Sequence, residues 1–285
     1  FDMGPTIITM PPVFKGIVER SGRKMEDYCE LIDLDPQWRC FYEDGTRIDL
    51  LKDVEAMSHA LEAQFPGTGT GRGYTDFVAF SRRMFRLSER VFFYRDVGSV
   101  RDVMKSVPMS DFGMLRDVMA MRFHSTVGAT VKKHIPDPHM RQLVEHFLQY
   151  VGSSPFMAPA ILSLIAAAQV DQGCWYPMGG TRKIAGTLEK ILREMDVDIR
   201  TGNGVSRIMS SGDKVTGVVL DDGTELEADI VISNCDVQRT YRDLDASPAA
   251  LKEQKNISSK YPPACSGVVL YLGLDRQYDH LLHHD

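Results

Sequence analysis

The stretch Gly173–Met195, GCWYPMGGTRKIAGTLEKILREM, decides the fold class, because a glycine turn leads directly into an amphipathic helix. From Thr181 to Met195 apolar side chains recur every three or four residues, and most charged side chains lie away from that face. The apolar face comprises Ile184, Leu188, Ile191, Leu192 and Met195. Two glycines let a backbone approach a flat ligand, and Thr181 can cap the first turn. Tyr176–Thr181 is therefore either a plain tight turn or a cofactor contact.

Three short runs with the composition of strands follow that helix. They are Val205–Met209, Val215–Leu220 and Ile230–Ser233. Asp221-Asp222-Gly223 supplies the turn between the second run and the third, and we expect the third to be a buried strand. Ligands of α/β folds gather beyond the carboxyl ends of such strands, so Asn234 and Cys235 either cap a loop or bind a ligand. These runs predict an α/β segment over residues 173–245.

The chain before this segment changes character twice. Two prolines open a predicted helix over Pro11–Arg20, and Asp44-Gly45 centres a predicted hairpin over Trp38–Leu50. Between Asp53 and Gln172 apolar residues recur with a helical period, interrupted by Pro and Gly turns. A helical block inside an α/β chain predicts a mixed α/β fold whose two spatial domains interleave along the sequence.

Composition excludes several classes of function. Asp and Glu total 39 against 33 Lys and Arg, for a formal net charge of -6, which argues against nucleic acid as a partner. The five cysteines are scattered and include no Cys-x-x-Cys pair, so we expect a reducing cytoplasm and neither a zinc site nor a redox couple. His280, His283 and His284 lie close together near the end, yet we predict no metal site there.

Two other segments invite a functional interpretation. The alternating glycines of Gly67–Gly73 lack the G-x-G-x-x-G spacing of a dinucleotide-binding loop and a preceding strand, so we predict a flexible connector. The longest apolar stretch, Phe156–Val170, contains Pro159 and is shorter than the roughly 20 residues that cross a bilayer. It is either a buried core helix or an apolar wall facing a hydrophobic substrate or a lipid surface. The first six residues show neither a start methionine nor a signal peptide, which predicts a start inside a longer protein.

Four runs together resemble the bacterial phytoene desaturases, a carotenoid desaturase family of the FAD-dependent, amine-oxidase-like superfamily. The runs are FDMGPT from Phe1, YPMGGT from Tyr176, DIVISNCDVQRTY from Asp229 and LYLGLDRQYDHLLHHD from Leu270. They occur in that family's order, and the similarity covers essentially the whole chain. The last run is the most specific, because it resembles the desaturases more than other flavoproteins of the superfamily.

The resemblance implies a partial FAD domain of the glutathione-reductase type, interleaved with a helical and antiparallel-sheet substrate domain. Residues 1–52 would begin the substrate domain, 53–172 form its helical, membrane-facing part, 173–245 belong to the FAD domain, and 246–285 return to the substrate-domain sheet. FAD is the implied cofactor. The residues implied to lie near it are Gly4, Pro5, Thr6, Pro177, Gly179, Gly180, Val205, Asn234 and Cys235. The family's G-x-G-x-x-G segment precedes the residues that match Phe1, so we expect this piece alone to bind FAD poorly.

The implied reaction is desaturation of a long isoprenoid such as phytoene or diapophytoene, by a cytoplasmic enzyme bound peripherally to the inner membrane. Such a protein mainly positions substrate C–H bonds and excludes water, so no residue is nominated as a general base. Candidates to line a polyene tunnel, or else to pack in the core, are Met114, Met119, Met121, Phe156, Ile161 and Leu164. The alternatives are a carotenoid isomerase, retinoid saturase or protoporphyrinogen-oxidase-like flavoprotein, and a non-redox module binding a prenylated lipid. No pattern indicates an oligomeric state.

Overall fold

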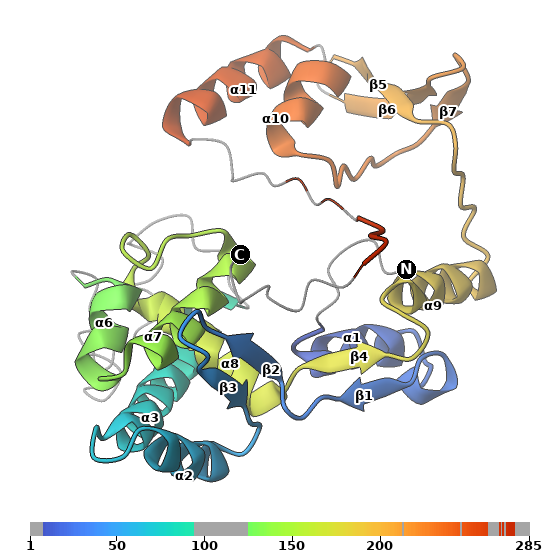
Figure 1. Ribbon diagram of the computed structural model, residues 1–285. Helices are drawn as coiled ribbons and strands as arrows, with labels where there is room; N and C mark the ends of the chain where they lie inside the picture. The colour runs from blue at the N-terminus through green and yellow to red at the C-terminus, as the bar shows by residue number, and fades with distance from the viewer. Residues whose placement is uncertain are drawn as a thin grey trace, which may run out of the picture. The chain divides into compact units, whose positions relative to one another are not determined.

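The computed structural model describes residues 8–93, 125–212, 214–245 and 247–261, together with 268, 270 and 272–276. These residues form helices and small antiparallel sheets, which agrees with the predicted mixture of α and β structure. They divide into two compact units (Figure 1). The first holds the described residues up to Ile191 and from Leu270 on, and the second spans Leu192–Val269.

A small antiparallel layer forms one end of the first unit. Its strands are β1 (Leu31–Asp33) and β4 (Trp175–Pro177), which pair with Leu31 opposite Pro177. Ile8 adds a backbone bridge on Trp175, so β4 is bonded on both sides. Residues far apart in the sequence therefore meet on one strand.

Two predicted helices flank this layer (Figure 1). The first is α1 (Pro11–Arg20), which is followed by the short 3₁₀ helix η1 (Met25–Asp27), and the second is α9 (Arg182–Glu194). Both predictions are confirmed, with the ends of α9 within one residue of the expected range. Val18 of α1 and Ile191 of α9 belong to one buried cluster, because the apolar faces of the two helices pack together.

The predicted hairpin is also confirmed. Strand β2 (Trp38–Phe41) pairs with β3 (Arg47–Leu50), with Trp38 opposite Leu50. The Gly45 amide donates to the Tyr42 carbonyl at 2.9 Å and closes the turn, in which Gly45 adopts a φ of 84°. A glycine meets this positive φ without steric cost, which is why Asp-Gly signals such a turn.

The helical block follows as predicted between Asp53 and Gln172, in the described part of that range. Its helices are α2 (Val54–Gln64), α3 (Thr70–Ser88), the π-helix η2 (Glu89–Phe93), α6 (Val127–His134), α7 (Pro138–Glu145), the 3₁₀ helices η3 (His146–Val151) and η4 (Ala160–Ser163), and α8 (Leu164–Gln172). Asp53, Thr126 and Asp137 cap α2, α6 and α7, each accepting a hydrogen bond from an amide of the first turn.

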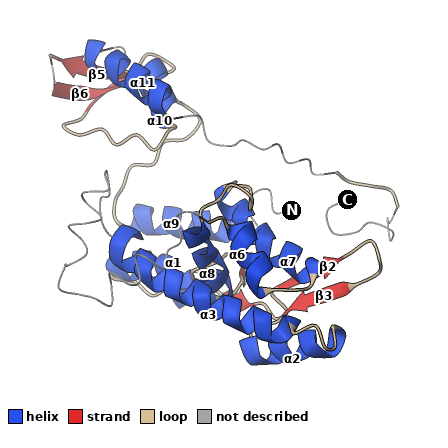
Figure 2. Ribbon diagram, turned by 90° about the vertical axis from the view of Figure 1, so that its left-hand side faces the viewer, coloured by secondary structure: helices blue, strands red, loops and turns tan. Residues whose placement is uncertain are grey.

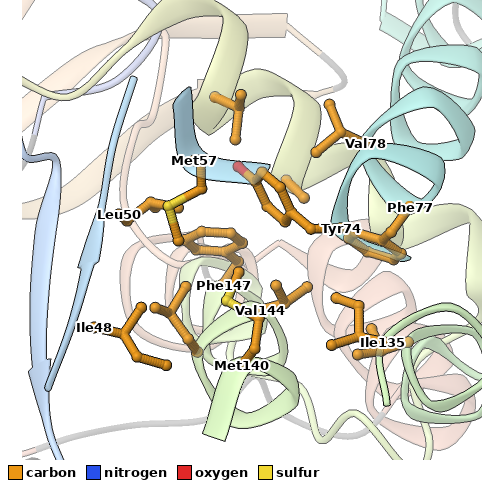
Figure 3. Close-up of a cluster of buried hydrophobic side chains, with 14 of the residues drawn as sticks. Ile48, Leu50, Met57, Tyr74, Phe77, Val78, Ile135, Met140, Val144 and Phe147 are labelled. Carbon is orange, nitrogen blue, oxygen red and sulfur yellow. The ribbon is translucent and has the colours of Figure 1, made fainter. Parts of the chain in front are cut away.

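The main core of the first unit lies between this block and the hairpin. Figure 3 shows Ile48 and Leu50 of β3 facing side chains of α2, α3 and α7. Among them, Tyr74, Phe77 and Met140 are at most 1% exposed. Burial of large apolar side chains is the dominant stabilising term here, at roughly 1.5–3 kcal/mol for each one removed from water.

The prediction of a flexible connector over Gly67–Gly73 is wrong for its second half. Helix α3 begins at Thr70, after Gly69 with a φ of 73°. Both Gly71 and Gly73 are buried inside that helix. A Cβ on Gly73 would stand only 2.0 Å from the carbonyl oxygen of His134 at the end of α6. The glycines serve close packing of backbones, a constraint that local spacing does not reveal.

The apolar stretch Phe156–Val170 is divided between two environments. Its second part enters α8, where Ala166, Ala167 and Val170 are buried, so the interpretation as a core helix holds there. Phe156 and Met157 instead precede the helix and are 77% and 80% exposed. Within the described residues, no helix combines the length and the apolar composition needed to cross a bilayer.

The second unit contains a three-stranded antiparallel sheet. Its strands are β5 (Val205–Ser211), β6 (Lys214–Leu220) and β7 (Glu225–Glu227), in that order. The helices are α10 (Val237–Arg239), the π-helix η5 (Thr240–Leu244) and α11 (Pro248–Lys260), and β5 and α11 both contact η5. Figure 2 shows α10 and α11 next to each other in this unit. Helix α11 was not among the expected elements, although Ser247 and Pro248 form a typical helix start.

The predicted strand Ile230–Ser233 is wrong. The partner of β6 across the Asp221–Gly223 turn is Glu225–Glu227, with Leu226 opposite Val218. Residues 230–233 have no ladder in the structure, and Ile230 and Ile232 are 78% and 89% exposed. Because the turn is tight, the residues immediately after it pair with β6. The edge of β6 is then occupied, and the more apolar run Ile230–Ser233 does not pair with it.

Candidate functional site

The predicted cofactor residues Pro177, Gly179 and Gly180 lie together in one turn between β4 and α9. Just after β4, the Met178 amide donates to the carbonyl of Glu30, the residue before β1, at 2.9 Å. The start of the turn is therefore still bonded to the neighbouring strand segment. The Gly180 amide then donates to the Pro177 carbonyl at 2.9 Å and closes the turn. The turn therefore has a defined backbone shape set by hydrogen bonds on both sides.

The two glycines are required by that shape. Gly179 and Gly180 have φ values of 88° and 90°, a region that residues with a side chain rarely adopt. A Cβ on Gly179 would stand 2.8 Å from Cε of Lys183 in the first turn of α9. The bare backbone of this turn can thus approach a flat group closely, next to the Lys183 cation and the positive end of the helix.

A pocket of about 400 Å³ lies in the same unit, against the strand that carries the turn. It shares Leu31 and Trp175 with the β1–β4 layer, and Glu30 directly precedes β1. Its complete lining is Pro11, Pro12, Lys15, Met25, Glu26, Cys29, Glu30, Leu31 and Trp175. The walls are mostly apolar, a composition typical of sites for small hydrophobic ligands.

Two of the three charged residues of the pocket, Lys15 and Glu26, pair with each other. Lys15 donates to Glu26 at 3.2 Å. The pKa of Glu26 is lowered, chiefly by a hydrogen bond from its own backbone amide and then by Lys15. A carboxylate held ionised in this way is a poor proton acceptor at neutral pH, so Glu26 is not suited to act as a general base.

Sequence reasoning missed the pocket residues Cys29 and Trp175 and the proline pair Pro11-Pro12. A signal was present, because Trp175 directly precedes the motif YPMGGT and the prolines open the first predicted helix. What brings them together is the pairing of β1 with β4 across more than a hundred residues, which no local pattern encodes.

The remaining predicted cofactor residues lie elsewhere. Val205 opens β5 in the second unit, paired with Leu220, and its side chain is 41% exposed. Asn234 and Cys235 are exposed in the loop before α10. Gly4, Pro5 and Thr6 lie outside the described residues.

The loop that holds Asn234 and Cys235 is organised by its neighbours. Ser233 Oγ lies 2.8 Å from Thr240 Oγ1, and the Cys235 amide donates to Ser233 Oγ at 3.4 Å. Asp236 accepts the Arg239 amide at 3.0 Å and caps α10. Loop capping therefore accounts for Ser233 and Asp236, while a contact of Asn234 or Cys235 to a cofactor stays a prediction.

In the part of the chain that the structure describes, no group of three or more His, Cys, Asp or Glu side chains is arranged to hold a metal ion. The histidines His280, His283 and His284 lie outside that part. Among the tunnel candidates, Met114, Met119 and Met121 also lie outside it, Phe156 is on the surface, and Ile161 and Leu164 are half-buried.

Comparison with known protein families gives the affiliation. Residues 1–281 match the model of the flavin-containing amine oxidoreductases. The chain belongs to this family. The predicted membership of the FAD-dependent, amine-oxidase-like superfamily is thereby confirmed, and the family's flavin supports FAD as the cofactor.

Two curated relatives align with the whole chain. They are a 4,4'-diapolycopene oxygenase from a Methylomonas species, 35% identical, and a 4,4'-diaponeurosporene oxygenase from Staphylococcus haemolyticus, 34% identical. The alignments cover 100% of this chain and 55% of each relative, so the chain spans about half the length of the curated relatives it matches. A solved structure from Pyrococcus furiosus, with a TM-score of 0.51 and 17% identity, covers 91% of this chain and 52% of its own and shows a likeness of fold alone.

The turn at Pro177, Gly179 and Gly180 fits a flavin. No side chain projects from either glycine, and the neighbouring pocket has mostly apolar walls. When bound, FAD supplies the two-electron acceptor for oxidation of the substrate. Among the described residues of the first unit, the Pro177–Gly180 backbone would be the part to lie against the flat ring.

The cysteines provide a direct check on the burial of the β2–β3 hairpin. Burial raises the pKa of the Cys40 thiol to about 11 and raises that of Cys29, where the nearby Lys183 partly opposes the shift. Because the thiolate is the reactive form, native protein treated with iodoacetamide near pH ~8 is expected to be modified at exposed Cys235 well before Cys40. Peptide mass spectrometry over time measures the order, and both sites should react alike in urea. Equal rates of modification at Cys235 and Cys40 in the native protein would contradict the burial of Cys40 in the hairpin.

Proposed function

We propose that the protein containing this chain is an FAD-dependent oxidoreductase that oxidises a long carotenoid-type isoprenoid. The observation that carries the proposal is the alignment of the whole chain with relatives named as diapolycopene and diaponeurosporene oxygenases. The pocket beside the glycine turn supports it, because mostly apolar walls suit a hydrocarbon substrate.

The names of the relatives favour oxygenation of the polyene as the first candidate reaction. The ordered motifs FDMGPT, YPMGGT and LYLGLDRQYDHLLHHD favour desaturation as the second, by their resemblance to phytoene desaturases. In desaturation a C–C single bond becomes a double bond as two hydrogens leave the substrate, whereas oxygenation adds oxygen to the chain. The two reactions therefore differ in the elemental composition of the product.

The residues of the first unit have the same role in either reaction. The apolar walls formed by Pro11, Pro12, Met25 and Leu31 bind the hydrocarbon and exclude water. The pairing of Leu31 with Pro177 joins one of these walls directly to the Pro177–Gly180 turn. A glutathione-reductase-type FAD domain, interleaved with this substrate-binding part, completes the proposed enzyme.

The test is product analysis with the full-length protein. The gene is coexpressed with pathways that make phytoene, diapophytoene or their desaturated polyenes, and the pigments are analysed by chromatography and mass spectrometry. Oxygen-containing products support the first candidate, and products that have lost hydrogen support the second. A full-length protein that is colourless, cannot be reconstituted with FAD and leaves every polyene unchanged would contradict the proposal.

A further inference from the structure

The loop before η4 is held in one conformation by backbone hydrogen bonds. The Gly128 amide of α6 donates to the Pro155 carbonyl at 2.8 Å, and the Val127 amide donates to the Ala158 carbonyl at 2.9 Å. Within the loop, the Ala158 amide donates to the Ser154 carbonyl at 2.8 Å. A Cβ on Gly128 would meet the Pro155 oxygen at 3.1 Å, so the loop lies tightly on the helix.

This rigid loop presents its largest apolar side chains to solvent. Phe156 and Met157 are 77% and 80% exposed, whereas the small residues Ala158 and Ala160 are buried. Single exposed apolar residues are common on protein surfaces, but two adjacent ones at the tip of a tied-down loop form a persistent apolar protrusion. Val151, 49% exposed, lies just before the loop and extends the apolar surface.

Basic side chains lie in the groove that Phe156 borders. Phe156 borders a groove of about 470 Å³ between α6 and α7, to which Lys132 and Arg141 also contribute. Lys133 is exposed next to Lys132 in the last turn of α6, a helix without acidic residues. The one acid of the groove, Glu145, is partly buried, and its pKa is raised by that burial. No Asp, Glu, Lys or Arg occurs between Glu145 and Asp171.

We propose that the Phe156–Met157 tip, flanked by Lys132, Lys133 and Arg141, is the surface by which this protein docks on an anionic lipid bilayer. The apolar tip enters the interfacial region, and the cations face the lipid phosphates, the division of roles by which peripheral proteins hold to membranes. The whole chain carries a net charge of -6, so attraction to an anionic surface must come from a local basic face of this kind. The inference stands on the geometry of the first unit and does not depend on the reaction.

Vesicle binding by the full-length protein tests the proposal. Wild type is expected to sediment with phosphatidylcholine vesicles that contain phosphatidylglycerol, to bind pure phosphatidylcholine less, and to lose binding as salt is raised. The double variant Phe156→Ser/Met157→Ser should bind the mixed vesicles at least about tenfold more weakly, because two apolar anchors are lost. Lys132→Gln/Lys133→Gln should reduce the preference for the anionic vesicles.

A matched control is available on α1, where Val13 and Ile17 are 51% and 45% exposed on the same unit. Val13→Ser/Ile17→Ser removes a similar apolar pair and should leave vesicle binding unchanged. Circular dichroism verifies that both double variants are folded. Unchanged binding by the Phe156/Met157 variant, or equal losses in both variants, would overturn the proposal. A second result would also overturn it: sedimentation that shows a dimer for wild type and for the α1 variant but a monomer for the Phe156/Met157 variant. The tip would then contact a second copy of the chain.

Discussion

The substitution Gly73→Ala is expected to lower the free energy of unfolding of the first unit by about 2–4 kcal/mol. The added Cβ would lie 2.0 Å from the His134 carbonyl oxygen and 3.3 Å from Cδ of Pro136. Both contacts involve backbone or a proline ring, so α3 and the end of α6 must move apart, opening the core between them. Urea unfolding monitored by circular dichroism measures the change.

Gly16→Ala is the matched control, since Gly16 also lies in a helix of this unit and its Cβ would meet no atom within 4 Å. Alanine has the higher helix propensity, so this variant should be neutral or more stable by up to about 1 kcal/mol. Equal stability of the Gly73 variant and wild type would show that α3 and α6 are not packed backbone to backbone.

The second large effect is expected for Gly179→Val in the full-length protein, which should be purified with most of its FAD missing. Valine is strained at a φ of 88°, and its side chain would start 2.8 Å from Lys183 Cε. The turn must then change shape or place a branched side chain where the proposal puts the flavin ring. The ratio of flavin absorbance to protein absorbance gives the occupancy, and titration with added FAD gives the affinity.

Gly45→Val separates this effect from backbone strain in general. Gly45 has a similar φ of 84°, and a Cβ there would meet no atom within 4 Å. It lies in the hairpin turn, so its replacement should lower stability while flavin occupancy stays at the wild-type level. Full flavin occupancy in the Gly179 variant would show that the turn is not part of the flavin-binding site.

Elements with strong local signals were predicted correctly. The helix α1 opens with two prolines, the β2–β3 hairpin centres on Asp44-Gly45, and α9 has an apolar stripe of helical period. In each case the preference arises within a few residues, from fixed proline φ, from glycine's access to positive φ, or from one face that must leave water. Tertiary contacts reinforce these choices and do not have to override them.

The errors came where the neighbours of a segment in the fold decide its structure. Ile230–Ser233 has the composition of a strand, but a strand needs a neighbour, and the one beside β6 is taken by Glu225–Glu227. Gly71 and Gly73 look like a flexible run until α2 and the end of α6 are placed against them. Composition states what a segment can become, and the available neighbours decide what it becomes.

The candidate site shows the same division. The sequence by itself determined the glycine turn before α9 and, through motifs spread over the whole chain, the flavin family, because both depend on residue identity at fixed short spacing. Only the tertiary structure decided that Leu31 pairs with Pro177 and that Cys29 and Trp175 share an apolar pocket beside that turn. It alone also turned Phe156 and Met157 outward while burying the alanines next to them. The physical reason is that burial and pairing are properties of contacts between distant segments, which form only once the chain has folded.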